Sequence, residues 1–116
     1  MEERIPKIII DLDLIESEVP SPIWKKGREY FESGRVGVVS LRGEGEFRAR
    51  VDGASKTSYS VSATIENGRL SSHQCECEAH RRFPGPCKHV IALLLKADSL
   101  FGRHSEFDGD YPFDSF

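Results

Sequence analysis

The sequence has few of the features that mark membrane proteins, secreted proteins or disulfide-stabilised proteins. It contains no apolar run near the roughly 18 residues that a membrane span requires, and 30% of its 116 residues are charged. Residues 1–7 include two glutamates and lack the basic start and apolar core of a secretory signal. There are only three cysteines, and this odd number disfavours a disulfide framework. We therefore expect one small intracellular domain, cytoplasmic or nuclear, with no membrane partner.

Signatures of catalysis are also missing. The chain has no glycine-rich phosphate loop, no Ser-His-Asp set and no pair of carboxylates that suggests a cleft. It lacks the His-x-Glu run that a zinc deaminase would need. Cys87 and His89 lie two residues apart at the expected start of a helix, which does not place the imidazole on the neighbouring sulfur. We therefore expect no enzymatic activity and no small-molecule substrate.

Charge is distributed unevenly along the chain. Residues 1–21 have six acids against two bases, residues 22–103 have 14 Lys and Arg against nine acids, and residues 104–116 have four acids and no Lys or Arg. This pattern suggests an extended acidic N-terminal segment (1–21), a basic domain (22–103) and an acidic, aromatic tail (104–116) too polar to form a core. A basic domain suits an anionic partner, although ordinary solvated faces between solubilising tails would give the same balance.

The first part of the chain suggests an extended segment followed by a helix. Residues 5–15 should be extended, with 8–10 as an edge strand, and residues 18–22 should form a linker. A helix is expected over residues 22–33, with Ser21 as its cap and Pro22 in its first position. Gly34 then provides a left-handed stop.

The middle of the chain changes to a period of two, which is typical of strands with one buried face. Tight turns separate these strands, and Asn67-Gly68 is a strong hairpin signal because both positions tolerate positive φ. A second, strongly apolar helix follows Cys87 and should pack deeply against the sheet and the first helix. The fold class is therefore α+β: an N-terminal helix packed on an antiparallel four-stranded meander, then a zinc knuckle leading into a C-terminal helix. The expected strands are residues 36–42, 46–51, 57–65 and 70–74.

All three cysteines lie within thirteen positions, beside a histidine. Cys75 and Cys77 fall at a strand end, a nine-residue loop follows, and Cys87 and His89 open the second helix. Three thiolates and one imidazole complete the tetrahedral shell that Zn²⁺ accepts, and four protein ligands leave no site for an activated water. The sequence therefore predicts one structural zinc ion. His80, within the loop, is an alternative ligand that we expect to lie on the exposed surface.

This ligand pattern, Cys-x-Cys followed by Cys-x-His and an apolar helix, resembles the SWIM-type zinc finger. An upstream stretch is similar to the segment W-x-x-G-x-x-Y-x-x-x-G-x-V that often precedes this finger, through Trp24, Gly27, Tyr30 and residues 34–36. The resemblance implies zinc held by the three cysteines and His89. It also implies a role in DNA binding or protein association in settings such as transposases, Snf-type DNA-translocating ATPases and recombination accessory factors.

Five basic residues are candidate contacts to nucleic acid. Arg81 and Arg82 lie in the zinc loop, Lys88 lies between the last two ligands, and Arg48 and Arg50 point outward from a strand. We expect a module that binds nucleic acid, DNA above all, as an accessory to DNA-processing machinery. The alternative is a protein-interaction module without direct nucleic-acid contact, which the alternating aromatic and acidic residues of the tail would suit.

Overall fold

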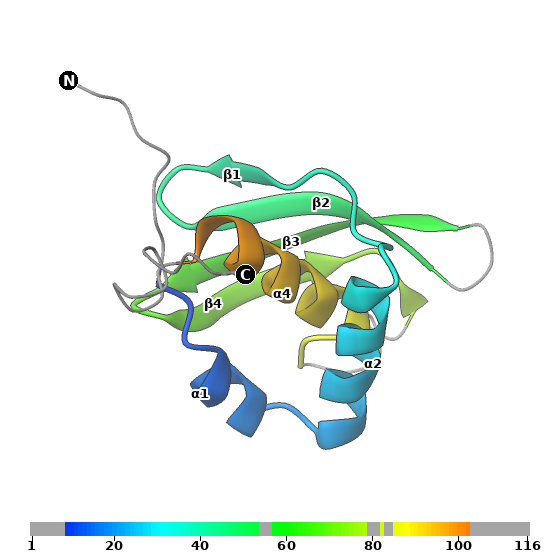
Figure 1. Cartoon of the computed structure of the whole chain (residues 1–116), viewed down its shortest axis with the longest axis horizontal. Coiled ribbons are helices and arrows are strands. Elements are labelled where there is room, and N and C mark those ends of the chain that lie inside the picture. Colours follow the sequence, from blue (N-terminus) through cyan, green and yellow to red (C-terminus); the bar gives the residue numbers. More distant parts are fainter. Residues whose placement is uncertain (1–8, 54–56, 79–81, 83–84, 103–116) are drawn as a thin grey trace, which may run out of the picture.

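The computed structural model describes residues 9–53, 57–78, 82 and 85–102. It has the expected α+β fold, with helices gathered on one side of a four-stranded sheet (Figure 1). No helix in these described ranges is long and apolar enough to cross a membrane. The elements are α1 (Leu12–Ser17), α2 (Ser21–Glu32), β1 (Ser40–Arg42), β2 (Glu46–Asp52), β3 (Ser58–Glu66), β4 (Arg69–Cys75) and α4 (Lys88–Phe101).

The sheet is an antiparallel meander in the order β1-β2-β3-β4. Side chains along each strand alternate between a buried face and an open face of the sheet. In β2, Phe47 and Val51 are fully buried, whereas Arg48 and Arg50, which lie between them in the sequence, are exposed. The β3–β4 turn has the predicted chemistry, with a positive φ at both Asn67 (54°) and Gly68 (82°).

Helix α4 is the centre of the core. It lies against β2 and β3, and α2 packs chiefly against α4 (Figure 1). This confirms that the C-terminal helix is deeply packed. Six apolar side chains between its first and third turns are fully buried and Leu95 is partly buried, which explains why the helix is apolar around most of its circumference. The six fully buried side chains are Val90, Ile91, Ala92, Leu93, Leu94 and Ala97.

The expected extended conformation of residues 5–15 is wrong for the part that forms α1. The Asp11 side chain caps this helix by accepting a hydrogen bond from the Leu14 N–H at 3.1 Å. Ile15 in α1 and Val19 just after the helix are buried in the core. Only Ile10 keeps strand-like pairing, in an isolated parallel bridge to Gly68, whereas residues 5–8 lie outside the described ranges.

Two other boundaries differ from expectation. The first strand was expected over residues 36–42, but β1 contains only Ser40–Arg42, and Val36 forms an isolated bridge to Val51. The chain departs from the sheet between these points, where the Val38 side chain is 88% exposed. Helix α2 begins at Ser21, with Pro20 rather than Ser21 as its N-cap, so Ser21 provides no side-chain cap. The predicted organisation into a segment (1–21), a domain (22–103) and a tail (104–116) stays a prediction. The tail lies outside the described residues.

Candidate metal centre

The four predicted ligands meet where β4 ends and α4 begins. Cys75 is the last residue of β4, and Cys77 follows it by two positions. Cys87 is the N-cap of α4, and its carbonyl accepts hydrogen bonds from the first-turn N–H groups at 3.0 and 3.1 Å. His89 lies in that first turn. The ligand atoms of all four residues lie within 4.8 Å of one another. All four side chains are nearly enclosed, with exposed fractions of 9% or less.

The geometry fits a tetrahedral zinc ion. His89 turns its Nδ1 atom toward the sulfur atoms, at 3.7 Å from the Cys75 Sγ and 3.8 Å from the Cys87 Sγ. A tetrahedron with the usual Zn–S and Zn–N bond lengths places a nitrogen and a sulfur ligand about 3.6 Å apart. All three thiols are free of disulfide bonds. The residues therefore form a site for one zinc ion with four protein ligands, the closed arrangement of structural zinc.

Two aromatic rings pack against the imidazole, and two cations lie over one of these rings. The His89 ring packs against Tyr59, with centroids 4.8 Å apart, and edge-on against Tyr30 at 5.4 Å. Its Nε2 atom is buried and has no hydrogen-bond partner among the described residues. The Arg35 guanidinium lies 4.6 Å, and the Lys88 ammonium 5.7 Å, from the Tyr30 ring centroid. Only the Tyr30 ring separates these cations from the His89 imidazole. The zinc ion and three thiolates of the centre would carry a net charge of about −1.

The two facing thiols have opposite proton affinities in the metal-free protein. The hydrogen bond with Cys87 raises the pKa of Cys75 far above its usual range, and burial adds to this effect. The hydrogen bond from Cys75 lowers the pKa of Cys87 to about 3. The pair therefore holds one proton and one negative charge, so a metal ion that takes both sulfurs as thiolates must displace the shared proton.

Residues 59–98 match the family model of the SWIM zinc finger. This part of the chain is a SWIM zinc finger. It contains nearly all of β3, all of β4, the four ligands and most of α4. Helix α2 and the first hairpin precede the matched residues, so the resemblance noted for Trp24 through Val36 stays a prediction. No curated protein and no solved structure matched the chain.

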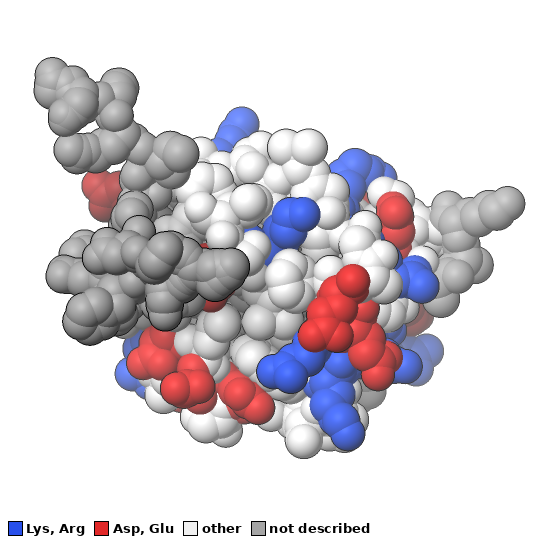
Figure 2. All heavy atoms as spheres, in the orientation of Figure 1, with Lys and Arg blue, Asp and Glu red and all other residues white. Residues whose placement is uncertain are grey.

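The five candidate nucleic-acid contacts do not form one surface. Arg48 and Arg50 lie on the open face of the sheet, and Lys88 lies over Tyr30 on the helix side. Arg82 is exposed and lies 3.7 Å from the Glu78 carboxylate, whereas Arg81 and the alternative ligand His80 fall outside the described residues. On the face seen in Figure 2, basic and acidic side chains lie side by side rather than in a patch of one sign.

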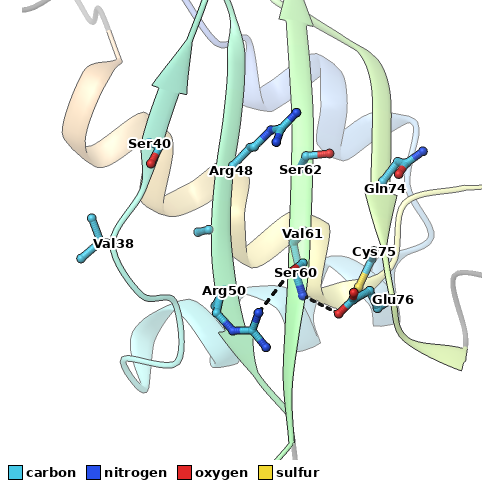
Figure 3. Close-up of a pocket in the computed structure, with 11 residues that line it drawn as sticks. Val38, Ser40, Arg48, Arg50, Ser60, Val61, Ser62, Gln74, Cys75 and Glu76 are labelled. Carbon is cyan, nitrogen blue, oxygen red and sulfur yellow. Dashed lines mark hydrogen bonds between the residues drawn. The ribbon is translucent and has the colours of Figure 1, made fainter.

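The sequence reasoning missed how closely the finger is joined to the open face of the sheet. Glu76 lies between two zinc ligands, and its Oε1 atom accepts a hydrogen bond from the Ser60 N–H at 2.9 Å (Figure 3). Gln74 lies opposite Ser62 in the β3–β4 register. Alternation shows that these side chains share a face, but only the register shows which of them are neighbours.

Proposed function

We propose that this chain is a structural-zinc module that binds nucleic acid, with DNA as the principal partner, as an accessory to DNA-processing machinery. The observation that carries the proposal is the closed set of four ligands around a site that joins the end of β4 to the start of α4. Zinc with four protein ligands has no open position for substrate or water, so its contribution is to the fold. The proposal therefore assigns no catalysis to this centre.

The charge of the domain supports an anionic partner. Residues 22–103 have 14 Lys and Arg against nine Asp and Glu, although the whole chain has a net charge of −3. Nucleic-acid affinity depends on local basic residues rather than on net charge, because each contact to phosphate releases condensed counterions. The zinc centre, whose net charge would be about −1, slightly offsets this attraction near the sulfur atoms.

A purely apolar protein interface has less support. The large apolar side chains that are strongly exposed in the described ranges are Ile9, Val38 and Leu100, which belong to three separate segments. Single exposed apolar residues are normal on soluble domains and do not mark an interface. The protein-interaction alternative is therefore an outcome of the test rather than a second proposal.

The proposal is tested by a metal assay followed by DNA titrations of the full chain. We expect one zinc ion per chain and binding to DNA that weakens steeply as salt concentration rises. Binding should also decrease when a chelator removes the metal. Zinc-loaded protein that binds neither single- nor double-stranded DNA at low salt would refute the proposal and favour a protein partner.

A further inference from the structure

The open face of the sheet contains a polar groove that the helices do not cover. The groove has a volume of about 510 Å³ and crosses the central strands (Figure 3). Cys75 and Glu76 form one end of it, so the groove reaches the metal centre. Most of its lining side chains are hydrogen-bond donors, including Arg48, Arg50, Ser60, Ser62 and Gln74.

Arg50 is held in place without being neutralised. Its Nε donates to the Ser58 Oγ at 2.9 Å, its Nη2 to the Ser58 carbonyl at 3.1 Å, and its Nη1 to the Ser60 Oγ at 3.2 Å. All three acceptors are uncharged, and no carboxylate pairs with Arg50 within the described part of the chain. Because a guanidinium has five N–H donors, two remain for a ligand, in an orientation that the serines already fix.

The other charges of the groove are balanced more closely. Both Nε and Nη2 of Arg48 lie 2.9 Å from the Glu46 Oε2. This pair is exposed, so it is worth little in water and an incoming anion can compete for the guanidinium. Glu76 adds one negative charge at the metal end, where the Ser60 N–H holds its carboxylate. Arg50 is therefore the strongest anion contact of the groove.

Among the residues that the structure describes, none that lines the groove has an aromatic ring on which bases could stack. The aromatic residues of the four strands are Phe47 and Tyr59, and both lie on the helix side: Phe47 is fully buried and Tyr59 packs on His89. Proteins that bind single strands without sequence preference usually combine a basic groove with stacking aromatics. A surface with arginines and hydroxyls but no aromatics suits phosphates instead.

We infer that this groove binds the phosphate backbone of double-stranded nucleic acid, with Arg50 as its principal contact and Arg48 as a second. The inference rests on the proposed function and specifies the surface and the form of nucleic acid. Two arginine contacts give a slope of log Kobs against log salt of about −1.8 for duplex DNA. Arg50→Gln should reduce the magnitude of that slope by about 1 and weaken duplex binding about tenfold at low salt.

The experiment is a fluorescence anisotropy titration of the zinc-loaded full chain against a short mixed-sequence duplex and its single strand, over a series of salt concentrations. Arg50→Gln is compared with Arg28→Gln, the same change at an exposed arginine of α2 on the helix side. Arg50→Lys keeps the charge and should keep the slope while losing part of the affinity. This variant keeps the test decisive if Arg50→Gln lowers stability.

Each outcome separates the inference from the proposed function. If wild-type protein binds DNA and neither Arg50→Gln nor Arg48→Gln changes the slope, the groove is not the contact surface, although the proposed function stands. Tighter binding of the single strand than of the duplex would overturn the assignment to duplex. Equal competition by poly-glutamate of matched charge would assign the groove to an acidic protein partner. No DNA binding by the wild type would refute the proposed function itself.

Discussion

Replacement of Gly27 by alanine tests how closely α2 and α4 approach beside the metal centre. A Cβ atom at Gly27 would lie 2.5 Å from both the Cβ and the Cγ2 of Ile91, and 3.1 Å from the Lys88 carbonyl oxygen. Ile91 is fully buried and cannot rotate both atoms away, because its Cβ is attached to the backbone. Ordinary contact begins near 3.4 Å, so the two helices would have to separate by about 1 Å.

Two effects of this substitution oppose each other, and their magnitudes decide the sign. In an exposed helix, glycine to alanine stabilises by about 1 kcal/mol through helix propensity. Overpacking a core costs about 1–3 kcal/mol, and the rigid obstacles here place the cost near the upper end. We expect a net loss of about 2 kcal/mol in the free energy of unfolding, which lowers Tm by about 8 °C for a domain of this size.

Thermal melts of the zinc-loaded protein followed by circular dichroism measure this change. The matched control is Gly85→Ala, where an added Cβ meets nothing within 4 Å and Tm should stay nearly constant. In a double-mutant cycle, Gly27→Ala combined with Ile91→Ala should cost less than the sum of the two changes, because the second removes one of the clashing atoms. A higher Tm for Gly27→Ala would show that propensity outweighs packing and refute the close approach.

Three further predictions concern the metal and the groove. Removal of zinc by a chelator should lower Tm by more than Gly27→Ala does, because structural zinc contributes on the order of 10 kcal/mol in small fingers. An unchanged Tm after verified removal would contradict a structural role for the metal. Zinc binding at neutral pH should release at least the proton held by Cys75, whose pKa is raised, so zinc affinity should rise with pH. Calorimetry in buffers of different ionisation enthalpy counts the released protons. Zinc binding without any proton release would refute this prediction. Glu76→Gln removes a negative charge from the groove and keeps an oxygen that can accept the Ser60 N–H, so duplex binding should become tighter without loss of zinc; weaker binding would count against the groove.

The parts of the fold that sequence alone predicted are those set by local chemistry. Alternation placed the strands within one or two residues for β2, β3 and β4, because a single-residue slip would expose residues such as Phe47 and Val61. The Asn67-Gly68 turn was predicted because few residues adopt positive φ. The metal ligands were predicted because their spacing brings three sulfurs and one nitrogen together once a strand and a helix flank the loop.

The parts that sequence alone did not predict depend on neighbours distant in the chain. Leu12, Ile15 and Val19 have helical spacing, but the adjacent isoleucines favoured an extended interpretation. In the structure α1 forms because it packs against β4, which is distant in the sequence. The hydrogen bond from Ser60 to Glu76 needs the β3–β4 register, and a bulge between Thr64 and Ile65 shifts that register nearer the turn. The helical spacing was a signal for α1 that the neighbouring isoleucines outweighed, whereas a single sequence contains no signal for the Ser60–Glu76 hydrogen bond.

The ligand spacing also determines which residues the zinc finger presents to solvent. Side chains alternate at the end of a strand, so when Cys75 and Cys77 both turn inward toward the metal, Glu76 between them must turn to the open face. Lys88, between Cys87 and His89, is likewise kept out of the ligand cluster and lies over Tyr30 on the helix side. A bound zinc ion would therefore hold each residue between a ligand pair in position without being coordinated by it. Changes at these two positions can alter the charge of either surface while the metal centre stays intact.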